Sequence, residues 1–226
     1  MHIVGIVGRS YYNKDNQEIV QTHDTVRRFL NNRDDVICIT LLSPEKNCLT
    51  KLEPGEDEVN NKIDYILDKC DAFVVPGGTY AYNFDEYVIN YAIEHDKPLL
   101  AICLGFQVLC NMFCKDRTKF DMTERKNIPR HTGKVEEYSH DVLIKDNTIL
   151  KEIIKEDKIP VNSVHHDIVN FEFDTLIVNA ISDDGIIEGV EYPNKKFIIG
   201  LQWHPEYLYD ENSKKILDCF INSIDK

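Results

Sequence analysis

Cys103 lies in a stretch whose residue pattern is typical of a catalytic nucleophile. Residues 98–110 begin as a short apolar run, as in a buried strand, and continue with the apolar spacing of a helix face. Ala101 and Gly105 flank Cys103 in the small-x-nucleophile-x-Gly pattern of a nucleophile elbow. Such a turn places the sulfur at a helix N-terminus, which favours a thiolate. The alternative is a buried, inert structural cysteine.

His204 and Glu206 offer a base and a carboxylate close together. Pro205 stands between them and fixes the backbone there. In an extended segment, side chains two residues apart project to the same side, so the carboxylate can hold the imidazole in one tautomer. With Cys103, they would form a nucleophile, a base and an orienting group. For His204 alone, an ordinary surface or core histidine is the alternative.

Gly77 and Gly78 directly follow the buried apolar run at 72–75. Glycine pairs are common in plain turns, which is one interpretation. The other is bare backbone whose N–H groups can approach a substrate closely.

These residues need a scaffold, and the surrounding pattern predicts an α/β fold. Strands are expected at 3–7, 36–42 and 72–75, and helices at 25–30, near 63–69 and at 84–95. This alternation implies a mostly parallel central sheet with helices on both faces. Ligands bind beyond the carboxyl ends of such strands, where Gly77-Gly78 and Cys103 would converge.

The second half of the chain predicts more strands and a closing helix. Strand-like alternation occurs at 134–145 and 174–180, antiparallel strands are expected at 186–191 and 197–202, and a helix at 212–224. Residues 43–61 and 114–130 are predicted to be loops. No repeat, low-complexity tract or linker is evident, so residues 1–226 are predicted to form a single domain.

Composition narrows the function classes. The formal net charge of −13 argues against nucleic acid or an anionic membrane as a partner. No apolar run reaches the roughly 18 residues that span a bilayer, and the first residues resemble a strand more than a signal peptide. Seven cysteines without a Cys-x-x-Cys pair suggest reduced thiols in a cytoplasmic protein.

Two groupings offer possible metal ligands, and neither is predicted to hold an ion. Cys103, Cys110 and Cys114 could share a helix face, but no neighbouring histidine or carboxylate completes the set. His165 and His166 are adjacent, so their side chains should project to different sides. The sequence therefore predicts no metal and no cofactor.

The motifs resemble the class I glutamine amidotransferase superfamily. Cys-Leu-Gly-Phe-Gln at 103–107 is similar to its Cys-x-Gly-x-Gln motif. The stretches 161–166, 184–188 and 200–206 are similar to the γ-glutamyl-γ-aminobutyrate hydrolase-like branch. The resemblance implies a flavodoxin-like fold and a Cys103, His204 and Glu206 triad. Ala101 and Asp167 depart from the usual Gly and Gln, and the Gly-Gly motif expected after the elbow helix is missing at 112–117.

The resemblance also implies roles for the surrounding residues. Leu104, with Gly77 and Gly78, would supply backbone N–H groups to an oxyanion hole. The substrate-binding residues would be Gln107, Ser163, His165 and His166.

Three hypotheses for function follow. The first is a cysteine-dependent hydrolase of γ-glutamyl amides, acting on a small molecule through a γ-glutamyl thioester on Cys103. The second is a glutaminase subunit that supplies ammonia to a separate synthase partner. The third is a non-catalytic binding protein that keeps the fold.

The excess of basic residues at 114–130 would favour an acidic leaving group if this loop lines the pocket; a solvated loop is the alternative.

Overall fold

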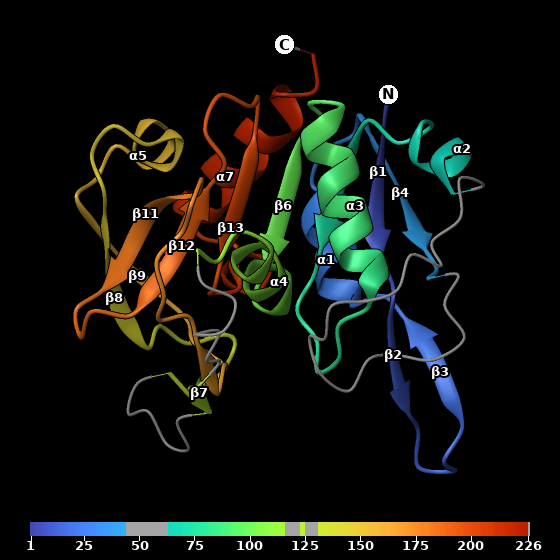
Figure 1. Cartoon of the computed structure of the whole chain (residues 1–226), viewed down its shortest axis with the longest axis horizontal. Helices are drawn as coiled ribbons and strands as arrows, with labels where there is room; N and C mark the ends of the chain where they lie inside the picture. Colours follow the sequence, from blue (N-terminus) through green and yellow to red (C-terminus); the bar gives the residue numbers. More distant parts are fainter. Residues whose placement is uncertain (44–62, 116–122, 125–130, 226) are drawn as a thin grey trace.

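A nine-stranded sheet forms the centre of the molecule in the computed structural model, which describes residues 1–43, 63–115, 123–124 and 131–225. The strand order is β4-β1-β5-β6-β13-β12-β11-β8-β9 (Figure 1). In chain order the strands are β1 (His2–Val7), β4 (Val36–Leu41), β5 (Ala72–Val75), β6 (Leu99–Ile102), β8 (His140–Ile144), β9 (Lys158–Val161), β11 (Ile177–Ser182), β12 (Ile187–Glu191) and β13 (Ile198–Leu201).

The sheet is mixed, so the prediction of a mostly parallel sheet holds only for one half. The pairings that link β4, β1, β5, β6 and β13 are parallel. Those that link β13, β12, β11, β8 and β9 are antiparallel. Parallel neighbours need long crossover connections, whereas β11, β12 and β13 follow one another through short turns that allow only antiparallel pairing.

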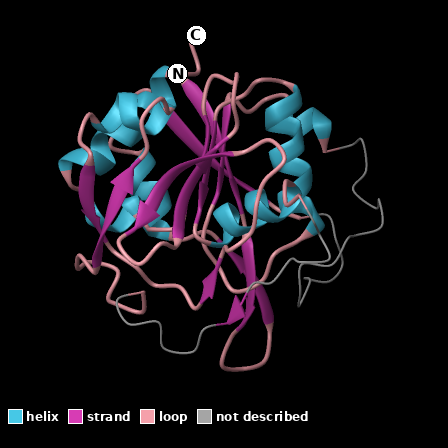
Figure 2. Ribbon diagram, turned by 60° about the vertical axis from the view of Figure 1, so that its left-hand side comes forward, coloured by secondary structure: helices cyan, strands magenta, loops and turns pink. Residues whose placement is uncertain are grey.

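Helices cover both faces of the sheet, as predicted (Figure 2). β5 shows how the strands serve both cores, because Ala72 and Val74 pack on one face and Phe73 and Val75 on the other. One core includes side chains of α1 (Asp24–Leu30), α5 (Ile149–Ile154) and α7 (Glu211–Asn222). The opposite core includes side chains of α2 (Asp64–Leu67), α3 (Asn83–Glu94) and α4 (Leu104–Met112).

Smaller elements complete the fold. A hairpin of β2 (Arg9–Tyr12) and β3 (Glu18–Gln21) projects away from the sheet (Figure 1). β7 (Thr123–Glu124) pairs with β10 (Asp167–Ile168), and α6 (Pro205–Leu208) follows β13. Most of the predicted loop at 43–61 and most of that at 114–130 lie outside the described residues. Of the helices that the structure describes, none combines the length and apolar character needed to cross a membrane.

Candidate active site

The turn between β6 and α4 holds Cys103 in a strained backbone conformation. Its φ is 51° and its ψ is −104°, which residues other than glycine rarely adopt and which costs about 1–3 kcal/mol. The close approach of α4 to β5 enforces the turn, because a Cβ on Gly105 would lie 2.0 Å from the carbonyl oxygen of Val75. The strand–turn–helix geometry of a nucleophile elbow is therefore present at Cys103.

The pairing of β6 with β13 brings His204 to Cys103. The two strands are parallel neighbours that end in register at Ile102 and Leu201, and the Cys103 N–H donates to the Leu201 carbonyl at 2.8 Å. A Cβ placed on Gly77 would lie 2.9 Å from Cε1 of His204 and 3.4 Å from Cβ of Cys103. Gly77, Cys103 and His204 thus meet beyond the carboxyl ends of the parallel strands.

Glu206 holds the His204 ring on its far side. Nδ1 of His204 lies 2.7 Å from Oε1 of Glu206, and the carboxylate is buried. The prediction that this segment is extended is wrong. Pro205 begins the short helix α6, so Glu206 lies in its first turn and His204 at its N-cap. Proline suits this first helical position because its missing N–H would have no partner there.

The environment of His204 favours its protonated form. Burial lowers the pKa of His204, but the negative charges of Glu206 and Cys103 outweigh burial and hold the pKa well above its ordinary value. A hydrogen bond that the protonated imidazole donates to the Cys103 sulfur acts in the same direction and raises the pKa of His204 further. His204 can therefore hold a proton between the sulfur and the carboxylate.

His23, at the N-cap of α1, is a further titratable group near this site that the sequence analysis did not identify. Burial lowers the pKa of His23, and the charges of His204 and Arg9 add to this effect while Glu206 opposes it.

A buried arginine orients the Gly77-Gly78 backbone. The Arg9 guanidinium donates to Pro76 O at 2.6 Å and to Gly77 O at 3.3 Å, and pairs with Asp85 at 2.5 Å. In a trans peptide the C=O and N–H groups point in opposite directions, so the N–H groups of Gly77 and Gly78 face away from Arg9. No local pattern in the sequence marked Arg9, whose partners lie 67 to 76 residues away.

The predicted substrate residues make internal contacts. Gln107 donates to the Gln202 side chain at 3.1 Å, and His165 lies 2.9 Å from the Asp167 carbonyl through Nδ1. Ser163 donates to the carbonyl of His131 at 3.1 Å. His166 is exposed. The role of these four side chains in substrate binding stays a prediction.

Asn162 fixes the backbone of the proposed base. Its Oδ1 accepts from the N–H of His204 at 2.8 Å, and its Nδ2 donates to the His204 carbonyl at 3.0 Å. Asn162 is fully buried and comes from the segment that follows β9. Asn162 lies within the motif at 161–166, but no local pattern in the sequence indicates its contact with His204.

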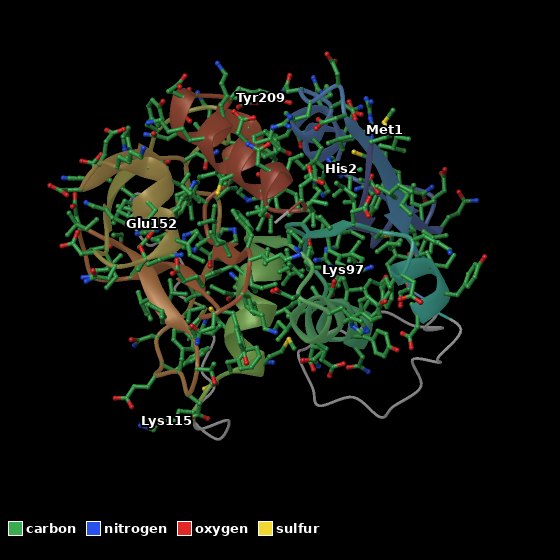
Figure 3. The ribbon with its side chains drawn as sticks, turned by 90° about the horizontal axis from the view of Figure 1, so that it is seen from above. Met1, His2, Lys97, Lys115, Glu152 and Tyr209 are labelled. Atoms are coloured by element: carbon green, nitrogen blue, oxygen red, sulfur yellow. The ribbon has the colours of Figure 1, made fainter. Side chains whose placement is uncertain are left out.

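Lys115 is the described basic residue of the loop at 114–130, which was predicted to favour an acidic leaving group. Lys115 lies at the edge of the molecule and pairs with Glu172 at 3.3 Å, both largely exposed (Figure 3). Arg117 and the other basic residues of this loop lie outside the described residues.

The fold is shared with a known glutaminase domain. The solved structure of the Trypanosoma brucei CTP synthase glutaminase domain with bound acivicin matches all of this chain and 95% of that one, with a TM-score of 0.70 at 18% identity. This likeness establishes an α/β fold with a central mixed sheet.

Sequence comparison identifies the family. A glutamine amidotransferase-like protein of Rickettsia prowazekii is 29% identical over 67% of this chain and 75% of its own length. The γ-glutamyl-γ-aminobutyrate hydrolase of Escherichia coli is 28% identical over 71% and 74%, whereas the match spans only 32% of a Pyrococcus abyssi CTP synthase. The Peptidase C26 family model matches residues 82–206, more than half of the chain. The chain therefore belongs to the Peptidase C26 family, within the class I glutamine amidotransferase superfamily.

Proposed function

We propose that this chain hydrolyses γ-glutamyl amide bonds, in γ-glutamyl amines or in glutamine, through a thioester on Cys103. One observation carries the proposal: His204 lies between a strained Cys103 and a buried Glu206, at the carboxyl ends of two adjacent strands. This arrangement matches the nucleophile, base and orienting group of covalent acyl transfer. The family and the similarity to a γ-glutamyl hydrolase support the same reaction.

In the acylation step, Nε2 of His204 has already taken the proton from the Cys103 thiol, in line with its raised pKa, and the resulting thiolate attacks the γ-carbonyl carbon. Glu206, bound to Nδ1, stabilises the imidazolium. The tetrahedral intermediate then collapses: the C–N bond breaks, His204 returns the proton to the leaving nitrogen, and free amine or ammonia departs. The product on the enzyme is a γ-glutamyl thioester.

In the deacylation step, water attacks the thioester carbon and gives a proton to His204. The C–S bond breaks, which restores the thiolate beside protonated His204, and glutamate leaves. We assign the oxyanion hole to the N–H of Leu104, at the first position of α4, and to Gly77 or Gly78. Arg9 supports this assignment by holding the opposing carbonyls. Each such donor contributes about 3–4 kcal/mol to transition-state stabilisation.

The remaining assignments complete the proposal. Gln107, Ser163, His165 and His166 would bind the glutamyl moiety, directly or through the backbone. The steps above involve no metal or organic cofactor. Residues 1–226 would act as a single domain.

The test is a panel of γ-glutamyl amides, with released glutamate measured for each. Cys103→Ser should abolish turnover while the far-ultraviolet circular dichroism stays unchanged, and Cys38→Ser, a matched change at a cysteine outside the site, should keep activity. Turnover by Cys103→Ser comparable with the wild type would remove the nucleophile assignment.

A glutaminase subunit that serves a synthase is the second candidate, favoured by the shared fold of the CTP synthase glutaminase domain. The panel separates the two. High activity of the purified chain on γ-glutamyl amides other than glutamine supports the hydrolase. Weak activity confined to glutamine supports the subunit. The non-catalytic alternative is supported if the purified chain turns over no substrate and its Cys103 does not react with acivicin, the ligand bound in that domain.

A further inference from the structure

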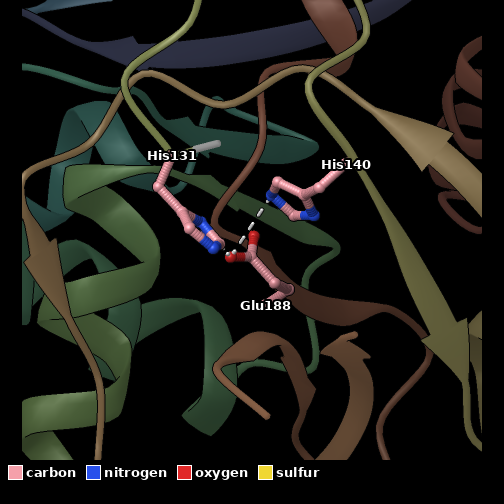
Figure 4. Close-up of side chains that lie close together, drawn as sticks. All are labelled: His131, His140 and Glu188. Carbon is pink, nitrogen blue, oxygen red and sulfur yellow. Dashed lines mark ion pairs between the residues drawn. The ribbon is translucent and has the colours of Figure 1, made fainter. Parts of the chain in front are cut away.

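A second cluster of titratable side chains includes His165 from the predicted substrate-binding segment at 163–166. It comprises His131, His140 on β8, His165 and Glu188 on β12. Each of them is at most 8% exposed, and Glu188 is fully buried. Figure 4 shows the rings of His131 and His140 directed at the Glu188 carboxylate from two sides. No sequence motif joins His131 and His140 to the others, so this cluster could not be predicted from the sequence.

The inner nitrogens of the three rings converge on one carboxylate oxygen. Oε1 of Glu188 lies 3.3 Å from Nδ1 of His131, 3.4 Å from Nε2 of His165 and 3.8 Å from Nε2 of His140. Nδ1 of His131 and Nε2 of His165 are 3.1 Å apart. Oγ of Ser163 also lies close, 3.3 Å from Nδ1 of His131.

The outer nitrogens of the same rings each face an acceptor. Nε2 of His131 lies 3.2 Å from the Asp184 carboxylate, and Nδ1 of His140 lies 3.3 Å from the Asp141 carbonyl. Nδ1 of His165 faces the Asp167 carbonyl at 2.9 Å. These acceptors direct the ring protons outward in the neutral tautomers. The inner nitrogens then present lone pairs to one another and to Glu188, as metal-binding histidines do.

That arrangement is unfavourable without a cation at its centre. Both carboxylate oxygens of Glu188 and Nε2 of His140 are buried without a hydrogen-bond partner among the described residues. A buried anion facing only lone pairs is strongly destabilising. A proton on the inner nitrogen of His131 or His165 would be donated to Glu188 and relieve part of this cost, but it would leave Nε2 of His140 unpartnered among the described residues.

We propose that His131, His140 and Glu188 bind one zinc-class divalent cation, with His165 as the nearest group for the fourth position. The donor atoms of the first three lie within 4.8 Å of one another. Bonds of about 2.0–2.2 Å in a tetrahedron place ligand atoms about 3.3–3.6 Å apart, close to the 3.1–3.8 Å contacts found here. Imidazole ligands with one carboxylate favour zinc over magnesium or calcium.

The position of this site points to a structural role. The ion would join strands β8 and β12 to the segments that carry His131 and His165. Its ligands are buried, as in closed structural zinc sites. The main chain of Glu188 accepts from the N–H of Gln202, two residues before His204. The inference goes beyond the proposed reaction, because none of its steps uses the ion.

Metal binding can be measured without any substrate. The Cys103→Ser chain serves as background, so that zinc bound by the Cys103 thiol does not interfere. Titration with Zn²⁺ against a chromophoric chelator should give one tight site per chain. Removing a residue that only orients a ligand typically weakens metal binding about 10–100-fold. Loss of a direct ligand in His131→Gln or His140→Gln should therefore weaken it by more than about 100-fold.

A control substitution at another histidine and the spectrum of bound cobalt(II) test whether the metal binds at this cluster. His95→Gln alters an exposed histidine on another element and should leave the affinity within about twofold. Cobalt(II) in the Cys103→Ser chain should show the intense visible bands of tetrahedral coordination without thiolate charge-transfer bands. Zinc should also raise the melting temperature of this chain and not of Glu188→Gln.

The proposal is overturned if the folded Cys103→Ser chain binds no stoichiometric zinc, which would leave a proton as the occupant. Thiolate bands with cobalt, or equal loss of affinity in His95→Gln, would overturn it as well. Because the background chain is itself measured, the outcome is decided even if His131→Gln or His140→Gln fails to fold.

Discussion

The proposed chemistry depends on one mobile proton, which Cys103 and His204 exchange while Glu206 holds the ring of His204. Glu206 is fixed on Nδ1, so only Nε2 of His204 can exchange a proton with sulfur or substrate. Sequence proximity made His204 and Glu206 visible as a pair, and the elbow pattern marked Cys103. Arg9 and Asn162 act through contacts far apart in the chain, which no local pattern encodes.

His204→Ala and Glu206→Gln should damage activity unequally. His204 transfers the proton in both half-reactions, and general acid–base catalysis contributes about 10²–10⁴-fold. Glu206 only orients and stabilises the ring, so Glu206→Gln should reduce kcat less. Steady-state kinetics on the best γ-glutamyl amide measures both, and their effects should not add in the double variant. If His204→Ala kept most of its kcat, His204 would not be the base.

The raised pKa of His204 predicts a pH-dependent contribution to stability. A group whose pKa is raised by folding stabilises the folded state fully below its unfolded pKa, here near 6.5, and loses this effect as pH rises through the folded pKa. Glu206→Gln removes the main raising charge. Its loss in free energy of unfolding should be largest below about pH 6.5 and shrink above the raised pKa.

Urea denaturation of the wild type and Glu206→Gln across this pH range measures that loss. A difference between the two chains that is the same at every pH would contradict a charge interaction between Glu206 and protonated His204.

At the scale of elements, the turn from β6 to α4 determines whether Cys103 lies next to His204 at the N-terminus of α4. Gly105→Ala would place a methyl group against the Val75 backbone, which cannot move aside as a side chain could. We expect this change to destabilise the chain by more than about 3 kcal/mol and to abolish turnover. Gly185→Ala is the contrast, since its Cβ meets nothing within 4 Å and only its φ of 88° is strained.

Gly185→Ala should therefore cost about 1–3 kcal/mol and keep kcat. Thermal melts and kinetics of both variants test the comparison. Equal effects of the two changes would show that the contact of Gly105 with β5 does not hold the elbow.

The elements differ in how far the sequence could predict them. β5 and β6 are fully buried apolar runs, and such runs are read easily as strands. The β2–β3 hairpin was missed, because its strands are not apolar runs and make one two-stranded ladder. α6 was expected to be extended, because four residues are too few to show a helical period.

At the scale of the whole molecule, the two halves of the sheet contribute different parts of the site. The parallel half carries Cys103, Gly77 and the strand leading to His204. The antiparallel half leads to Asn162 and carries Glu188; the predicted antiparallel pair at 186–191 and 197–202 is confirmed as β12 and β13, whereas its pairings with β11, β8 and β9 were not predicted. Register between distant strands depends on packing and not on local residue pattern, so the contact of Asn162 with His204 could not be predicted.

Asn162→Ala tests whether the antiparallel half positions the base. The change removes the partner of the His204 N–H and one of two donors to the His204 carbonyl, which keeps the Tyr207 N–H at 3.2 Å. Losing a buried hydrogen-bond partner costs about 1–3 kcal/mol. A displacement of about 1 Å in a catalytic group can reduce the rate about 10²-fold. We therefore expect kcat to fall by about 10–100-fold with little change in KM, and Asn170→Ala, an exposed asparagine on the same segment, to change neither.

A second readout separates positioning from simple loss of stability. Alkylation of Cys103 by iodoacetamide reports the pairing of its sulfur with His204, and its pH profile should change in Asn162→Ala at temperatures where the variant is fully folded. If the variant loses stability but keeps both kcat and the alkylation profile, Asn162 only supports the fold. If both change together, the contact between the two halves of the sheet sets the reactivity of Cys103.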